Sequence, residues 1–304
     1  MSHSQVQFDR WGHIHAHTWP FQVYKQYNEE LSRFIWASEA ASQYTYKTLA
    51  RDGAEENDEI TKFFPLPAHR IATMKDIKGW SSVYNDSQNW MRLNCNMAMS
   101  SNLETFFASI VALAIESNPG ILLGATRKID GGELLKAGGL DKKSYDRYIE
   151  ACSSGSWSSR LAAFEKLFGS APDSYRNGIK TLERIGKMRN NLGHAFGRDI
   201  DESRNFTTNT KLATDRIQFK TLIKYLEMAY NIVSDVDAYL LDNHIGEFQS
   251  IVAYHKNYGT YSKLATDADR VAAFKKNYGA TDQSIGKEFC KGVVAYYKSL
   301  YFKI

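Results

Sequence analysis

The chain has 304 residues, of which 43% are hydrophobic and 24% are charged, and it contains five prolines. This composition is ordinary for a folded protein, and it excludes collagen-like, low-complexity and intrinsically disordered classes. The formal net charge of +4 is too small by itself to indicate a nucleic-acid partner. The three cysteines, Cys95, Cys152 and Cys290, lie far apart and predict neither a disulfide framework nor a zinc site. A reducing, cytoplasmic location is therefore expected.

No membrane association is predicted. The longest apolar run, residues 106–115, covers only about half of the ~18 residues that a membrane-spanning helix needs. The N-terminal residues lack the basic start and apolar core of a secretory signal.

The hydrophobic periodicity predicts an almost entirely helical chain. Residues 1–20 are expected to be irregular or strand-like, and a glycine-rich loop is expected over residues 120–139. Pro119 ends the second long helix, because the residue before a proline is disfavoured in the helical conformation. A polar loop is expected over 198–214. The helices are predicted over residues 21–50, 83–116, 142–151, 157–168, 173–194, 215–241, 265–277 and 284–302.

The helix predicted over residues 173–194 carries the most informative charge pattern. The segment from Arg176 to Arg198 holds six basic residues against Glu183 alone. On a helical wheel of about 100° per residue, the basic residues form one stripe and the apolar residues form a separate arc. The apolar arc consists of Ile179, Leu182, Ile185, Met188 and Leu192, and the basic stripe consists of Arg176, Lys180, Arg184 and Lys187.

Arg189 and His194 break this division in different ways. Arg189 falls inside the apolar arc, where a charge needs a partner, a phosphate or an interface to offset its desolvation. His194 falls with the basic stripe, about 140° away from Arg189 on an ideal helix. The two side chains are therefore not expected to touch directly, unless Gly193 distorts the helix or a second subunit brings them together.

Arg189-Asn190, followed by three residues and then His194, resembles the Arg-x4-6-His motif of HEPN domains (higher eukaryotes and prokaryotes nucleotide-binding). The resemblance extends to Trp90 and to Leu103-Glu104, which match the first long helix of that family, and to residues 215–241, which match the helix after the motif. It covers approximately residues 80–245. It implies an all-α, HEPN-like helical bundle at 81–244, preceded by an N-terminal arm and helix at 1–80 and followed by a basic, aromatic helical extension at 245–304.

The resemblance implies a metal-independent endoribonuclease that uses no cofactor. RNA can be cleaved by attack of its own 2′-OH on the adjacent phosphate, which leaves 2′,3′-cyclic phosphate and 5′-OH ends. Histidine suits the proton transfer at neutral pH, and the planar guanidinium of arginine suits the developing phosphorane charge. His194 is assigned as the base or acid, Arg189 as the phosphate ligand and Asn190 as a positioning residue. The predicted RNA-backbone contacts are Lys180, Arg184, Lys187 and Arg198.

The same resemblance implies a homodimer whose two motifs line one cleft. It further suggests a bacterial toxin or anti-phage effector, with an antitoxin or regulatory protein as a possible partner.

Three alternative interpretations remain open. Arg189 could be a satisfied interface residue while His194 caps the helix near Gly197. The chain could also be a non-catalytic HEPN-like module that binds RNA, a nucleotide or a protein. A third possibility is a metalloenzyme, because the alternating histidines His13, His15 and His17 would share one face of a strand.

The C-terminal extension combines charge with aromatic content. Residues 245–304 hold nine basic and five acidic residues together with eleven aromatic residues. Interleaved basic and aromatic side chains can bind single-stranded RNA, whereas tyrosines at helical spacing are more often packed in a core. A docking surface for a regulatory protein is an equal alternative.

Overall fold

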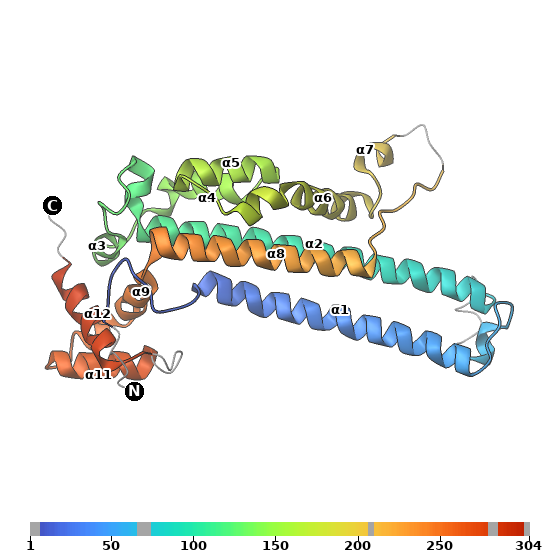
Figure 1. The fold of residues 1–304 in the computed structure, drawn as a ribbon, viewed down its shortest axis with the longest axis horizontal. Coiled ribbons are helices and arrows are strands. Elements are labelled where there is room, and N and C mark those ends of the chain that lie inside the picture. The colour runs from blue at the N-terminus through green and yellow to red at the C-terminus, as the bar shows by residue number, and fades with distance from the viewer. Residues whose placement is uncertain (1–6, 66–73, 206–209, 279–284, 301–304) are drawn as a thin grey trace. The chain divides into compact units, whose positions relative to one another are not determined.

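The structure is a computed structural model, and it describes residues 7–65, 74–205, 210–278 and 285–300. Within these ranges every regular secondary-structure element is a helix. The only β-type pairing there is an isolated bridge between Glu59 and Asp76. The prediction of an all-α protein is therefore confirmed (Figure 1). The principal helices are α1 (Trp19–Arg51), α2 (Ile77–Ser117), α3 (Gly131–Lys136), α4 (Asp146–Ser153), α5 (Trp157–Phe168), α6 (Asp173–Ala195), α7 (Ile200–Ser203), α8 (Phe219–Leu240), α9 (Phe248–Lys256), α10 (Tyr258–Tyr261), α11 (Asp267–Tyr278) and α12 (Lys287–Ser299).

The predicted loops contain short helices that the periodicity did not reveal. The segment predicted as a glycine-rich loop holds a 3-10 turn, Pro119–Leu123, and helix α3. Asp130 begins α3, because its side chain accepts a hydrogen bond from the backbone N–H of Gly132. Asp199 begins α7 in the same way, within the predicted polar loop. A single capping carboxylate is enough to start such a turn, and it leaves no periodic apolar pattern.

The chain forms two compact units, each assembled from segments that are distant in sequence. The terminal unit comprises residues 1–24, 104–179 and 231–304, so it includes both ends of the chain. The hairpin unit comprises residues 25–103 and 180–230. The boundaries between the units fall within α1, α2, α6 and α8.

The hairpin unit is organised around two antiparallel helices, the part of α1 after residue 24 and the part of α2 before residue 104 (Figure 1). A small apolar cluster of Leu49, Ile60, Ile77 and Trp80 fixes the end of the hairpin where the two helices are connected. The second half of α6 is tied to α2 by Asn96, whose side chain donates to the carbonyl of Ile185.

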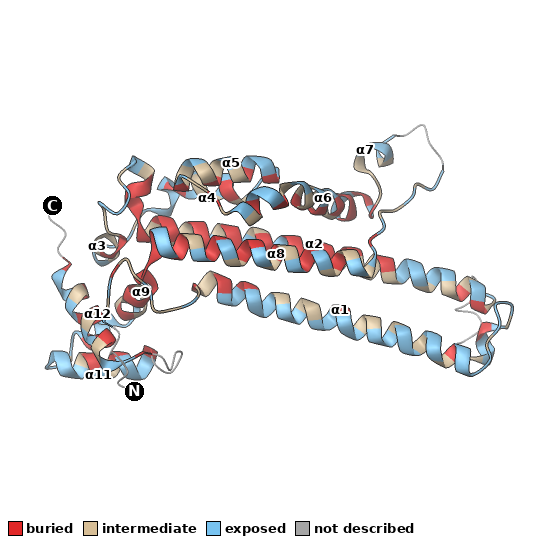
Figure 2. Ribbon diagram, viewed as in Figure 1, coloured by how far each residue is buried: buried red, intermediate tan, exposed pale blue. Residues whose placement is uncertain are grey.

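Burial in the hairpin unit is uneven (Figure 2). The apolar arc of α6 is buried as predicted, with Leu182 and Ile185 fully inaccessible to solvent. In contrast, α1 is exposed along most of its length and displays large apolar side chains such as Tyr27 and Phe34, which are 61% and 60% exposed. The core of this unit therefore lies mainly on α2, α6 and α8.

Helix α2 is the one helix in the described part of the chain that is long and apolar enough to cross a membrane, although the sequence predicted none. Half of its apolar window is buried inside the protein. Core helices of folded domains pass the same test of length and composition.

The terminal unit has a core rich in aromatic residues. Phe107 contacts the rings of Trp157, Phe164 and Tyr175, which belong to α5 and α6. A second aromatic cluster joins α9, α10, α11 and α12, and it consists of Tyr254, Tyr258, Tyr261, Phe274 and Tyr297. These rings bury the apolar surface that the short C-terminal helices could not bury alone.

Candidate functional site

The second half of α6 presents the predicted motif on the surface of the hairpin unit. Lys180, Arg184 and Lys187 are exposed on the turns that precede the motif. His194 lies in the last turn and is exposed as well. Because Leu182, Ile185, Met188 and Leu192 are buried against the unit, the helix is amphipathic in the way that its sequence predicts.

Arg189 and Asn190 are in direct contact. Arg189 is half-buried, consistent with its place at the apolar arc, and its Nη1 donates a hydrogen bond to Oδ1 of Asn190 over 3.0 Å. His194 joins neither of them. Its imidazole has no hydrogen-bond or ion-pair partner among the residues that the structure describes. Within one chain, the three predicted catalytic residues therefore form one pair and one separate histidine.

The end of α6 is closed by the backbone, so His194 is not needed as a cap. The N–H of Gly197 donates to the carbonyl of Asn191 over 2.9 Å, and the N–H of Arg198 donates to the carbonyl of Ala195 over 3.1 Å. Phe196 and Gly197 both adopt positive φ angles, 57° and 77°. His194 itself makes no hydrogen bond to a carbonyl of α6 among the residues that the structure describes.

Asn191, rather than Asn190, has a structural role that the sequence did not reveal. Asn191 is only 4% exposed, and its Nδ2 donates to Oδ2 of Asp215 over 2.9 Å. On the wheel it falls at about 120°, inside the basic stripe, where exposure is expected. It is buried because the segment before α8 covers this side of the helix, with the N–H of Asp215 donating to the carbonyl of Gly197.

Asn89 on α2 holds the other side of the same segment. Its Nδ2 donates to the carbonyl of Asp215, and its Oδ1 accepts from the N–H of Ile217, both over 2.9 Å. Asn89 and Asn191 thus fix the chain between α7 and α8 from two helices. Nothing in the local sequence marks either residue, since both bonds join positions that are distant along the chain.

A groove with a volume of about 740 Å³ opens between α2, the end of α6 and the segment before α8. Its wall contains an aromatic pair, because the rings of Trp90 and Phe196 lie 4.3 Å apart between centroids. Its basic side chains are Arg198, Lys211 and Arg216, of which Arg216 is paired with Asp86 over 2.6 Å. Arg198, predicted as an RNA contact, therefore lines a groove that also holds aromatic rings.

Lys187 forms an ion pair with another residue of the same chain. Its Nζ lies 3.2 Å from Oδ2 of Asp199, and both side chains are accessible to solvent. The backbone N–H of Glu202, followed by Lys187, stabilises the Asp199 carboxylate and lowers its pKa. Lys187 therefore positions the start of α7, whereas Lys180 and Arg184 have no ion-pair partner among the described residues.

The three N-terminal histidines belong to the terminal unit, and each one faces a different carboxylate. His13 contacts Asp242 at 2.7 Å, His15 lies 3.7 Å from Glu247, and His17 contacts Asp237 at 3.1 Å. Burial lowers the pKa of His13, but hydrogen bonds to Asp242 and to the carbonyl of His15 outweigh it, so the pKa is raised overall.

These pairs join the N-terminal arm to the end of α8 and the start of α9. No group of three or more metal-ligating side chains occurs in the described part of the chain. The arrangement gives the metalloenzyme alternative no ligand set.

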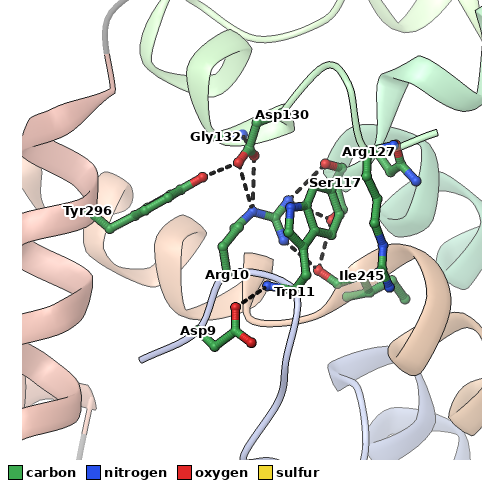
Figure 3. A network of polar contacts seen from close by, with 10 residues as sticks. Asp9, Arg10, Trp11, Ser117, Arg127, Asp130, Gly132, Ile245 and Tyr296 are labelled. Atoms are coloured by element: carbon green, nitrogen blue, oxygen red, sulfur yellow. Dashed lines mark hydrogen bonds and ion pairs between the residues drawn. The ribbon is translucent and has the colours of Figure 1, made fainter. Parts of the chain in front are cut away.

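Arg10 anchors the same arm (Figure 3). Its guanidinium bonds Asp130 at 3.0 Å, the carbonyl of Ile245 at 2.8 Å and both oxygens of Ser117. The hydroxyl of Tyr296 also donates a hydrogen bond to Asp130. The pKa of Tyr296 is raised, first by burial and second by this hydrogen bond. Because Arg10 is only 5% exposed and its hydrogen-bond partners come from three separate segments, it stabilises the terminal unit and is not accessible as a binding residue.

The C-terminal tyrosines are mostly core residues. Tyr254, Tyr261 and Tyr297 are at most 1% exposed, and Tyr278 is 8% exposed. Burial raises the pKa of Tyr254 to about 12. Tyr301 lies outside the described residues. Rings buried to this extent cannot stack on RNA bases, so the interpretation of these tyrosines as packing residues is the one that the structure favours.

Comparisons with protein-family models, with curated proteins and with solved structures found no match to this chain.

Proposed function

We propose that this chain is a metal-independent endoribonuclease of the HEPN type, with Arg189 and His194 as its catalytic residues and Asn190 as a positioning residue. The proposal rests on the exposure of the His194 side chain and on its lack of a hydrogen-bond partner among the described residues. Its imidazole is exposed and has no partner within the described chain, at the end of a helix that also exposes Lys180 and Arg184. A histidine in such a setting is available to exchange protons with a bound substrate.

In the proposed reaction, the imidazole of His194 accepts the proton of a ribose 2′-OH while the 2′-oxygen attacks the adjacent phosphorus. The bond from phosphorus to the 5′-oxygen then breaks, and the leaving oxygen takes up a proton from water, while the imidazolium of His194 returns its proton to the solvent. The products are a 2′,3′-cyclic phosphate and a 5′-OH end. The reaction needs no oxidant, metal or cofactor, because the nucleophile belongs to the RNA itself.

Arg189 is proposed to stabilise the negative charge that develops on the phosphorane. Its hydrogen bond to Oδ1 of Asn190 uses one N–H of the guanidinium and limits its rotation. The guanidinium is planar and presents its N–H donors as a fork that matches two phosphate oxygens. Asn190 would therefore act as a positioning residue for Arg189.

A second copy of the chain is part of this proposal. Arg189 and His194 make no contact with each other within one chain, whereas one phosphate must meet both groups. The HEPN resemblance implies a homodimer in which two copies of the motif line one cleft. In that arrangement, Lys180, Arg184 and Arg198 of each copy would contact the RNA backbone.

The proposal is tested by incubating an unstructured RNA with the protein in EDTA and analysing the product ends. We expect cleavage by the wild type that leaves cyclic phosphate ends. His194→Ala and Arg189→Ala should each abolish it. Arg33→Ala is the matched control, because Arg33 is an exposed arginine on α1 of the same unit, 79% accessible, and its loss should leave the rate unchanged.

Cleavage that survives both motif substitutions would contradict the assignment. RNA binding without cleavage by the wild type would instead favour the second candidate, a non-catalytic RNA-binding module. The basic and aromatic groove beside the motif is the observation that favours this second candidate.

The HEPN resemblance also supports a cellular role as a cytoplasmic toxin or anti-phage effector that an antitoxin or regulatory protein restrains. Expression of the wild type should then arrest bacterial growth, whereas expression of His194→Ala should not.

A further inference from the structure

Phe196 occupies a backbone position that normally belongs to glycine. It is the residue directly after α6, and its φ of 57° is in the left-handed region, which glycine usually occupies at the end of a helix. Non-glycine residues other than Asn and Asp rarely adopt this conformation, because Cβ approaches the following carbonyl. A strained aromatic residue next to a candidate active site is the kind of outlier from which a function can be inferred.

The side chain of Phe196 is also unusually accessible. It is 65% exposed, so burial of its ring does not account for the choice of a large apolar residue. Its ring contacts Trp90 on α2, with centroids 4.3 Å apart and planes inclined by 32°. The two rings form an aromatic surface on the wall of the groove, and we call this pair the aromatic platform.

Two basic side chains beside the platform are available to an anion. Arg198 donates its Nε–H to the carbonyl of Ala195, and its other guanidinium N–H groups have no partner in the described part of the chain. Lys211 has no ion-pair partner among the described residues. The carboxylate in the groove, Asp86, is already neutralised by Arg216. The groove therefore combines apolar rings with uncompensated positive charge.

The floor of the groove is fixed before any ligand binds. The segment before α8 is held by Asn89 from α2 and by Asn191 from α6. Gly197 lies against this segment, and a Cβ at that position would lie 3.6 Å from Leu93 and 3.8 Å from Thr214. A preformed site loses less conformational entropy when a ligand binds.

We propose that this groove is a binding subsite for an unpaired nucleotide of single-stranded RNA. The base stacks on the aromatic platform, and Arg198 and Lys211 contact the phosphates on either side. Bases in a duplex have no free face, whereas unpaired bases stack on aromatic rings with little dependence on sequence. Because Phe196 follows His194 by two residues, the subsite would hold a nucleotide next to the cleaved phosphate. This inference deepens the proposed function, since it specifies the RNA as single-stranded at this position.

The test measures binding apart from cleavage, in a His194→Ala background. The probe is a fluorescently labelled, unstructured RNA of ten nucleotides, and a blunt RNA duplex of the same sequence serves as the comparison. We expect the single strand to bind more tightly than the duplex. Phe196→Ala should weaken binding of the single strand by about 5- to 150-fold, the range for loss of one stacking aromatic, and should leave duplex binding unchanged.

Two matched variants separate stacking from packing. Phe196→Leu keeps an apolar side chain at the same backbone position but has no aromatic face, so it should bind as weakly as Phe196→Ala. Phe196→Trp keeps the face and should restore the affinity. Thermal unfolding and gel filtration of each variant would show that the fold and the oligomeric state are retained.

The proposal is overturned if the wild-type groove does not bind the single strand, or if Phe196→Leu binds like the wild type. It is also overturned if Phe196→Ala changes the oligomeric state while RNA affinity stays the same, because the platform would then be a protein interface. The two proposals fail separately. If the protein cleaves RNA in EDTA but its RNA affinity does not depend on Phe196, only the subsite proposal is contradicted. If the RNA affinity depends on Phe196 but no cleavage occurs, only the ribonuclease proposal is contradicted.

Discussion

Asn191 donates a hydrogen bond from its Nδ2 to Oδ2 of Asp215 over 2.9 Å, and this bond ties the motif helix to the segment that precedes α8. Its neighbour Asn190 is exposed and accepts a hydrogen bond from Arg189. Two adjacent asparagines of the same motif therefore have different roles, one inside the unit and one on its surface.

Because of this difference, we expect one alanine substitution to lower stability and the other to reduce RNA cleavage. Asn191→Ala should lower the free energy of unfolding by about 1–3 kcal/mol, because it leaves the partly buried Asp215 carboxylate without a donor. Asn190→Ala should change stability little and instead reduce RNA cleavage. Chemical denaturation and the cleavage assay, run on both variants, check the pair. Equal stability loss in the two variants would contradict the assignment.

Phe196 offers a second matched comparison, this time of backbone strain. Phe196→Gly and Phe196→Ala both remove the ring, but only glycine adopts a φ of 57° without a steric penalty. We therefore expect Phe196→Gly to be more stable than Phe196→Ala by about 1–2 kcal/mol. Both should lose affinity for single-stranded RNA. Denaturation midpoints measure the first effect, and equal midpoints would show that the helix does not end on a left-handed residue in solution.

His244 should make the protein sensitive to acid. It is 5% exposed, and burial, followed by the nearby Arg127, lowers its pKa to about 4 from the ordinary value of 6.5. Since its Nδ1 accepts a hydrogen bond from Asn118, the folded protein favours the neutral ring. The unfolded chain binds a proton below about pH 6.5 and the folded chain does not, so stability falls as the pH drops.

The expected loss between pH 6.5 and pH 4 is about 3 kcal/mol for this one residue. His244→Gln removes the titration while keeping an amide that can bond Asn118. Unfolding free energies of the wild type and this variant should run parallel above about pH 7 and diverge below pH 6.5. Curves that stay parallel down to pH 4 would mean that His244 is not held neutral.

Arg10 and Arg127 contrast a buried cation with an exposed one. Arg10→Ala should lower the free energy of unfolding by about 3–5 kcal/mol, because Asp130 keeps its charge without its main partner. Arg127 is exposed and bonds the backbone carbonyls of Asp242 and Asn243, so Arg127→Ala should cost only about 1–2 kcal/mol. Thermal unfolding compares the two. An equal loss of stability in the two variants would mean that the burial of Arg10 does not determine its contribution to stability.

Much of the local structure could be predicted from periodicity. The buried arc of α6 is set by apolar residues at helical spacing, such as Leu182 and Ile185, and the adjacent basic stripe follows from the same spacing. A helix's hydrogen bonds join residues four positions apart, so the sequence of one segment contains the information that places its faces. The position of the Arg189-to-His194 motif on that helix was determined in the same way.

The tertiary structure alone decided which residues meet across the chain. No periodic pattern links His13 with Asp242, Trp90 with Phe196, or Asn191 with Asp215, although each pair is in contact. The alternating histidines had predicted a shared strand face, whereas each ring in fact meets a separate carboxylate. Such contacts depend on how helices pack and where loops return, and the free energy that selects them comes from burying side chains of many segments at once. The sequence by itself determined the long helices and the position of the motif on one of them, and only packing determined the groove beside it.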